Sequence, residues 1–184
     1  MLDRLLERPR GFRSDRLTFR RMRGDDVAPA CARMTAACVA EMSISGEDLS
    51  DPKIFQRRCP YGIVIENEGA CVGHLTIHPS ARSFGIWIAP DQRRRGYASE
   101  AVKALLTHPW YGPHIQRVGC FADNIGCRKI IEDNGFVEES RRSVEGPLWP
   151  SPRLALFFRQ PWVAPRSPQP VRQRTLGTLH RGLK

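Results

Sequence analysis

The residues at positions 88–101, IAPDQRRRGYASEA, give the clearest chemical signal in the chain. Three consecutive arginines and Gly96 stand directly before an expected helix. The first turn of a helix presents free backbone N–H groups and the positive end of its dipole, so it attracts anions. Gly96 has no Cβ and would let the backbone approach a ligand, while arginines offer charged donors to phosphate oxygens. The segment fits a pyrophosphate cradle, and taken alone it fits a solvated basic turn equally well.

The other residues with chemical potential form no second motif. The six cysteines make no CxxC pair and no paired Cys/His spacing, so they predict free thiols and no metal site. His74 lies in an expected strand and is interpreted as a structural residue with satisfied hydrogen bonds. We expect Glu66 to be an exposed carboxylate, Glu100 to form an anchoring ion pair and Arg117 to be structural.

The hydrophobic pattern indicates which elements position these residues. Alternation over residues 17–22 predicts a first strand, and Asp25 and Asp26 predict the capped start of a helix that runs to about residue 42. Residues 43–60 are polar and are expected to hold a short helix and a loop. A helix is expected directly after the arginines, and a left-handed cap at Gly135 should end another at 125–133. Further strands are expected at 63–66, 71–77, 83–89, 115–121, 136–142 and 153–159, the first two joined as a hairpin through residues 67–69.

Length and charge limit the organisation of the chain. Its 184 residues fit one domain, which we place at residues 14–160 between an N-terminal extension, 1–13, and a basic, proline-containing, flexible tail, 161–184. The tail holds five basic residues and no acid, so half of the net charge of +10 lies there. No run of about 18 apolar residues and no signal peptide are evident, so the expected location is cytoplasmic, away from membranes.

Three segments resemble the GNAT superfamily of acyl-coenzyme A-dependent N-acetyltransferases. The first is the phosphate-binding pattern that joins Pro90, Arg93, Gly96 and Ala98. The second, RVGCFADNIGCRKIIEDNGF at residues 117–136, is similar to a second signature of the branch that acetylates ribosomal-protein N-termini. The opening SDRLTFRRMRGDD is similar to that branch's first strand and helix start. The resemblance implies an α+β fold with a mixed, mostly antiparallel sheet of six or seven strands and helices on both faces.

The resemblance also implies a set of site residues. The strand end at Ile88 and Ala89 would bind the pantetheine arm of acetyl-coenzyme A through its backbone, and an N–H of either residue could serve as an oxyanion donor. Asn124 would contact the pantetheine arm, and Cys127 would lie near the thioester sulfur, so these two are the candidate catalytic residues. The pyrophosphate would be held by Arg93, Arg94, Arg95, Gly96, Tyr97, Ala98 and Ser99.

Departures from the family pattern bear on the mechanism. Cys127 stands where the branch usually has Ser, and a thiol is a weaker hydrogen-bond donor than a hydroxyl. Ile131 occupies the position of a tyrosine acid in many other members, and Arg94 replaces a frequent glycine. Trp87 and Tyr97 are expected to pack, although either could line the cofactor groove. With no evident strong base, the expected acceptor is an α-amine or another weakly basic amine, which attacks the thioester directly in a ternary complex without metal.

Two alternative functions remain open from the sequence. One is a coenzyme A-binding module without catalysis, which the changes at Cys127 and Ile131 would permit. The other is a basic nucleic-acid-binding protein, although no recognised nucleic-acid motif occurs. Expected partners are acetyl-coenzyme A and an amine acceptor. Contact with nucleic acid or the ribosome through the basic tail, and a homodimer, are further possibilities.

Overall fold

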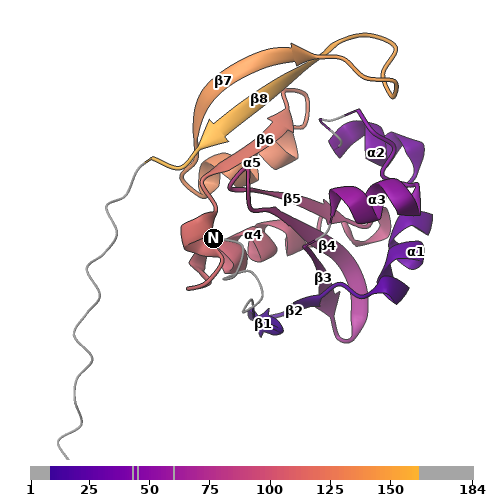
Figure 1. Ribbon diagram of the computed structural model, residues 1–184. Coiled ribbons are helices and arrows are strands. Elements are labelled where there is room, and N and C mark those ends of the chain that lie inside the picture. The colour runs from indigo at the N-terminus through magenta and orange to yellow at the C-terminus, as the bar shows by residue number, and fades with distance from the viewer. Residues whose placement is uncertain (1–8, 43, 45, 60, 162–184) are drawn as a thin grey trace, which may run out of the picture.

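The computed structural model describes residues 9–42, 44, 46–59 and 61–161. Their strands form one eight-stranded sheet in the order β1-β2-β3-β4-β5-β6-β8-β7, with helices on both faces (Figure 1). The strands are β1 (Gly11–Arg13), β2 (Thr18–Arg21), β3 (Gly62–Asn67), β4 (Ala70–His78), β5 (Ser83–Ile88), β6 (Arg117–Phe121), β7 (Val137–Val144) and β8 (Arg153–Arg159). The helices are α1 (Gly24–Ala32), α2 (Ala36–Met42), α3 (Pro52–Arg58), α4 (Tyr97–Thr107) and α5 (Ile125–Asp133), with short 3₁₀ turns at Pro90–Gln92 and Gly112–His114.

This architecture confirms the expected fold class, with one strand more than predicted. The additional strand, β1, pairs with β2 and lies within residues 1–13, which the sequence analysis set apart as an extension. All neighbouring strands are antiparallel except β5 and β6, which are parallel. The proposed tail lies outside the described residues from position 162 onward.

The helix expected from Gly24 to about residue 42 is two helices. The first ends at Ala32, after a proline at position 29 that cannot donate a backbone hydrogen bond. The second begins beyond Thr35, whose side-chain oxygen accepts a hydrogen bond from the backbone N–H of Cys38 at 3.2 Å. The expected Asp cap is also corrected: Arg23 is the capping residue, and Asp26 reaches back to its N–H. A threonine cap inside an apparently continuous pattern is the signal for this break.

The hairpin between β3 and β4 forms as predicted. Its two central turn residues, Glu68 and Gly69, have φ angles of 51° and 81°. Two consecutive positive φ values characterise a turn whose twist matches that of the paired strands. Gly135, after α5, also has a positive φ of 81°, in agreement with the expected left-handed cap.

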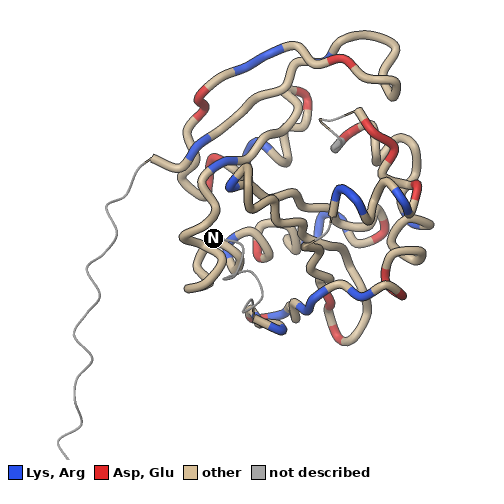
Figure 2. Tube along the Cα trace, in the orientation of Figure 1, with Lys and Arg blue, Asp and Glu red and all other residues tan. Residues whose placement is uncertain are grey.

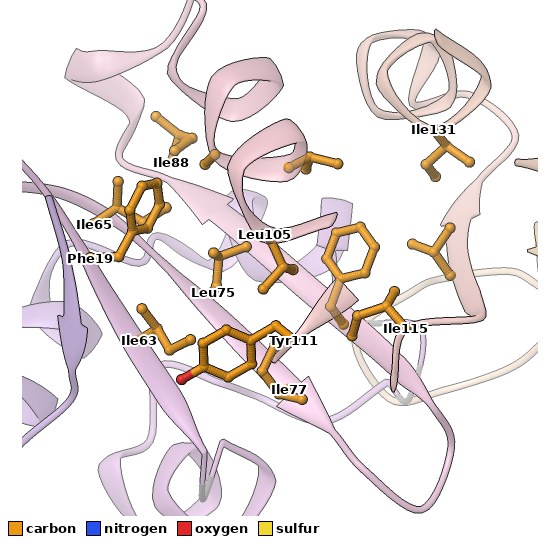
Figure 3. Close-up of a cluster of buried hydrophobic side chains, with 14 of the residues drawn as sticks. Phe19, Ile63, Ile65, Leu75, Ile77, Ile88, Leu105, Tyr111, Ile115 and Ile131 are labelled. Carbon is orange, nitrogen blue, oxygen red and sulfur yellow. The ribbon is translucent and has the colours of Figure 1, made fainter. Parts of the chain in front are cut away.

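Each face of the sheet has its own apolar core because side chains alternate along a strand. On one face, α4 and α5 pack on a large cluster to which Phe84 and Ile88 of β5 belong. Figure 3 shows this cluster, in which Leu105 of α4 meets sheet residues such as Leu75. On the other face, Trp87 and Ala89 pack against a second cluster that involves α1, α2 and α3. No described helix is long and apolar enough to cross a membrane.

Charged residues are distributed over the described chain without segregation by sign. Figure 2 shows basic and acidic segments interspersed along it. Many of the arginines are paired: Arg16 with Glu100, Arg33 with Asp91, and Arg153 with Asp123, all at 2.7 Å. The local positive charge of the described part is therefore largely compensated.

Candidate active site

The parallel strands β5 and β6 touch at only one end. Their single registered pair joins Ser83 to Arg117, at the first residue of each strand. Beyond that pair the strands diverge, as expected of neighbours that admit a cofactor. A cavity of about 760 Å³ opens between them and extends to α4 and α5. A space of this size lies within the usual range for small-molecule sites.

The loop that enters α4 forms one end of the cavity. Arg94 and Gly96 both have left-handed backbones, with φ angles of 64° and 80°. Gly96 is the capping residue of α4, and no side chain caps the helix. The first amides of a helix have no intrahelical acceptor, so they are available to an anion. A Cβ built on Gly96 would meet only the Arg16 guanidinium within 4 Å, at 3.4 Å. The approach to the amides is therefore open.

The three arginines of the loop do different things. Arg94 and Arg95 are exposed and free to face a bound anion. Arg93, in contrast, turns its side chain toward the end of β5 and toward α2. It donates to the Ile88 carbonyl oxygen, to Cys38 Sγ and to a Glu41 carboxylate oxygen, each at 3.2 Å. The Arg93 side chain therefore links the loop before α4 to the end of β5 and to α2.

The hydrogen bonds at the end of β5 show which of the two candidate oxyanion donors, the N–H of Ile88 or that of Ala89, is available. The N–H of Ala89 donates to the Val72 carbonyl of β4 at 3.0 Å, so it is already occupied. Hydrogen bonds to a given neighbour alternate along an antiparallel strand. The N–H of Ile88 therefore points away from β4, into the gap beside β6. Only Ile88 presents its amide to the cavity.

Asn124 and Cys127 meet at the start of α5. The Asn124 side-chain oxygen accepts a hydrogen bond from the Cys127 backbone N–H at 3.0 Å and so caps the helix. Asn124 therefore has a structural role that the sequence did not reveal, and its side-chain NH₂ remains for a ligand. Both residues line the cavity, together with Ile131 on its inner wall. The aliphatic side chain of Ile131 offers no acid there.

A second cysteine accompanies Cys127. Cys120, at 4% exposure on β6, lines the same cavity. The pKa of Cys120 is raised, first by its hydrogen bond with Cys127 and then by burial. The same hydrogen bond lowers the pKa of Cys127, against the opposing effect of burial. Sequence reasoning passed over Cys120, since no local motif links it to Cys127.

The far end of the cavity is formed by α2, the end of β6 and the start of β8. Its two lining carboxylates are both paired, Glu41 with Arg93 at 3.2 Å and Asp123 with Arg153 at 2.7 Å. Arg153 also donates to the Ala40 carbonyl of α2, as does the Trp149 indole N–H at 3.0 Å. From α2, Cys38 and Glu41 line this part of the cavity.

Glu100 forms the ion pair expected of it. Burial acts to raise its pKa, but hydrogen bonds from Ser14 and from Arg16 lower it. Arg16 also donates to the Arg95 carbonyl at 3.1 Å and lies 5.1 Å from the centre of the Tyr97 ring. Arg16 therefore links the loop before α4 to the segment before β2. Sequence reasoning missed this residue because the contact spans about 80 positions.

Two other interpretations are corrected by the structure. Glu66 is not simply exposed: it pairs with Arg20 at 2.8 Å, with 19% of its side chain exposed. His74 is not satisfied: its Nδ1 is buried without a hydrogen-bond partner in the described structure, as is Nε1 of neighbouring Trp87. Burial lowers the pKa of His74 to about 4, so the ring is neutral near pH 7.

The remaining candidates lie as expected. Trp87 and Tyr97 are buried, and both contribute to the cavity wall. The Tyr97 hydroxyl donates to Asn67 Oδ1 at 3.0 Å. Arg117 lies at the start of β6, where this strand still pairs with β5, and its guanidinium is 3.6 Å from a Glu139 carboxylate oxygen. Among the described residues, no group of three or more His, Cys, Asp or Glu side chains could hold a metal ion.

A splayed parallel strand pair, with a glycine-capped helix at one end and a capped helix at the other, defines an acyl-coenzyme A-dependent acetyltransferase fold. Residues 16–137 match the acetyltransferase (GNAT) domain family, and they make up more than half of the chain. The chain belongs to this family, whose members transfer an acetyl group from acetyl-coenzyme A to an amine. No curated protein matches the chain by sequence.

Solved structures of the same fold agree with this assignment. A GNAT acetyltransferase from Bacillus anthracis is 19% identical, with a TM-score of 0.64 over 81% of this chain and 96% of that one. The ribosomal L7/L12 α-N-protein acetyltransferase RimL in complex with coenzyme A is 17% identical, with a TM-score of 0.61 over 80% and 94%. Spermidine N-acetyltransferase from Vibrio cholerae is 17% identical, with a TM-score of 0.58 over 80% and 97%. At such identities the likeness establishes the fold, and the acceptor needs a separate argument.

Proposed function

We propose that this protein acetylates an α-amine, or an amine of similarly low basicity, by direct attack on acetyl-coenzyme A in a ternary complex. The observation on which the proposal rests is one continuous cavity. It runs from the start of α4, where no side chain caps the helix, past the Ile88 amide, to Cys127 at the start of α5. Anion-binding amides at one end and hydrogen-bond donors near the middle match a long nucleotide thioester.

The phosphate end uses backbone amides and charge. The left-handed backbone at Arg94 and Gly96 turns the loop so that successive N–H groups converge at the start of α4. Arg94 and Arg95 add exposed positive charge, which is suited to the oxygens of a diphosphate. Because Gly96 leaves the approach open, the ligand can come within hydrogen-bonding distance of the amides.

At the reactive end, acetyl-coenzyme A would supply the thioester, and the chain would supply two donors. The N–H of Ile88 points into the gap and is suited to the carbonyl oxygen of the thioester, where negative charge develops. The Cys127 thiol accepts from Cys120, so its own hydrogen remains for the departing sulfur. The NH₂ of Asn124 lies at the same helix start and can orient the pantetheine arm. These roles make Cys127 and Ile88 the groups in contact with the reacting atoms.

The acceptor class follows from the groups that line the described part of the cavity, where neither carboxylate is without an arginine partner. Both lining carboxylates are paired with arginine, and Ile131 replaces the usual tyrosine. A free lysine side chain, with a pKa of about 10.4, is neutral for roughly one part in 2,500 at pH 7. An α-amine, with a pKa of about 7.7–8.0, is neutral for roughly 10–15%. A site without strong base assistance therefore suits the α-amine, and a structural neighbour that acetylates a ribosomal-protein α-amine supports this choice.

Two peptides test the proposal. One has a free N-terminus and blocked lysines, and the other has a blocked N-terminus and one free lysine. We expect acetylation of the first and little of the second, measured as acetyl-coenzyme A-dependent mass gain. A clear preference for the lysine peptide would refute the α-amine assignment. Activity on neither, with intact coenzyme A binding, would favour a small-molecule amine or a binding module without catalysis.

The pH dependence gives an independent check. If the chain provides little base assistance, the rate at subsaturating peptide should follow the neutral fraction of the acceptor. It should rise with pH and level off near 8 for an α-amine. A plateau that does not move when the acceptor's pKa is changed would instead indicate an enzyme base.

A further inference from the structure

Cys120 and Cys127 form a pair of thiols on the cofactor cavity, and the proposed acetyl transfer uses only one of them. Cys120 comes from β6 and Cys127 from the first turn of α5, seven positions later. The chain folds back between strand and helix, so that both residues line the same cavity, and each thiol shifts the pKa of the other. Both also pack in the core cluster on that face of the sheet. The buried Cys120 thiol has no role in acetyl transfer, yet it lies beside the more accessible Cys127 thiol, and this arrangement suggests a second reaction.

The two thiols are not equivalent. Cys127 is partly exposed and lies in the first turn of a helix, where the positive end of the helix dipole favours a thiolate. The Cys120 thiol donates to its sulfur, which favours the thiolate further. Cys120 is only 4% exposed and stays protonated as the donor. This asymmetry is the one required of an attacking and a resolving cysteine.

We propose that Cys120 and Cys127 form a dithiol site that undergoes thiol–disulfide exchange with a small disulfide entering the cofactor cavity. Cys127 releases its proton to solvent, and the resulting thiolate attacks one sulfur of the disulfide RSSR. A Cys127–SR bond forms, and RS⁻ leaves. This thiolate takes the proton of Cys120, whose sulfur then attacks Cys127 Sγ and expels the second RS⁻, which is protonated by solvent. In total, two protein thiols become one disulfide, and RSSR becomes two RSH.

The shape of the cavity favours a disulfide that contains coenzyme A. Its phosphate end would hold the nucleotide part of a disulfide formed by coenzyme A, which places the S–S bond near Cys127. A disulfide draws two sulfurs to about 2.05 Å. Closure would therefore pull Cys127 toward β6 and remove its S–H from the cavity. If the proposed function holds, oxidation stops acetyl transfer, and a reducing agent restores it.

One proteolytic peptide reports on the site. Trypsin cleaves after Arg117 and Arg128, and the resulting peptide, residues 118–128, contains both cysteines and no other. Full-length protein is incubated with coenzyme A disulfide or with oxidised glutathione, its free thiols are alkylated, and it is then digested. We expect peptide 118–128 to lack both alkyl groups and to be lighter than its reduced form by two hydrogen atoms. The coenzyme A reagent should act faster than glutathione.

Single-cysteine variants test whether Cys127 attacks first and Cys120 then resolves the mixed disulfide. Cys120→Ser should stop at the mixed disulfide, so its peptide retains one added RS group on Cys127. Cys127→Ser should leave Cys120 unmodified. If the wild-type peptide keeps two alkylatable thiols while exposed Cys71 takes up the reagent, the proposal is wrong. It is also wrong if Cys120 is modified equally well without Cys127.

The catalytic consequence is measured separately, as acetylated peptide per minute before and after oxidation. We expect a reversible loss of severalfold or more, at least that of Cys127→Ala, because the S–H donor of Cys127 is removed in both cases. A closed disulfide with unchanged turnover would overturn the inhibitory effect. Absence of turnover in the reduced protein would instead refute the proposed function, and the peptide masses would still decide the dithiol chemistry.

Discussion

Replacing Gly96 by alanine should separate cofactor binding from folding. Gly96 has a φ of +80°, and a Cβ there would have space, since only the flexible Arg16 side chain comes within 4 Å. The folding cost is therefore the left-handed backbone alone, about 1–2 kcal/mol for a residue with a Cβ. Gly69 provides a matched control, with a φ of +81° and no atom within 4 Å of the place that a Cβ would take. Gly69→Ala should lose the same stability, because the two backbones are alike.

The variants should differ only in coenzyme A binding. The methyl group of Gly96→Ala would occupy the space through which phosphate oxygens approach the amides of α4. Loss of one hydrogen bond to a charged group costs about 1.5–3 kcal/mol, which is a roughly 10- to 150-fold weaker affinity. Urea unfolding measures the stability, and titration calorimetry with coenzyme A measures the affinity. Equal affinity in Gly96→Ala and wild type, or equal losses in both variants, would refute the location of the phosphate site.

Three further predictions concern the other groups of the site. Asn124→Ala should lose about 1 kcal/mol of stability with the helix cap, whereas Asn124→Asp should keep the cap. Weaker coenzyme A binding in both variants would show that the side-chain NH₂ contacts the ligand. Unchanged binding in Asn124→Asp would contradict that contact. Cys127→Ser should retain or raise turnover and Cys127→Ala should lower it severalfold, about 1 kcal/mol, while a stable acetyl group on Cys127 after incubation with acetyl-coenzyme A alone would contradict direct transfer. His74 binds a proton near pH 6.5 in the unfolded chain and only near pH 4 in the folded protein, so the free energy of unfolding should fall as pH drops through this window, by up to about 3 kcal/mol. Urea unfolding of His74→Gln should show a shallower decline with falling pH. The same dependence on pH in both proteins would refute the buried neutral ring.

Much of the fold was predictable from the sequence because its signals are local. Helix α5 has the bounds expected from the left-handed cap at Gly135, Ile125–Asp133, and the hairpin follows from turn residues that tolerate positive φ. The phosphate loop was recognisable because its chemistry lies in adjacent residues, with Gly96 directly before a helix start. The break between α1 and α2 was missed although Thr35 signalled it, since the apolar pattern continues on both sides.

The assignments that failed concern hydrogen bonds between distant segments. Glu66 has the composition of a surface residue, but it pairs with Arg20 of the neighbouring strand. His74 was expected to find a partner, and β5 places the Trp87 ring beside it instead, with ring centres 5.2 Å apart. Spacing along the chain does not specify which strand lies alongside.

The sequence by itself determined the family and most of the order of the elements, and it predicted the residues of a phosphate site, since hydrophobic period and turn chemistry act over a few positions. Only the tertiary structure decided which of these residues present a free group to the cavity. The pairing of β4 with β5 occupies the Ala89 amide and leaves that of Ile88. The divergence of β5 from β6 opens the cavity, and the return of the chain from β6 to α5 brings Cys120 to Cys127. These features depend on strand partners far apart in sequence, and backbone hydrogen bonds are directional, so a group's availability is fixed only once its neighbour is in place.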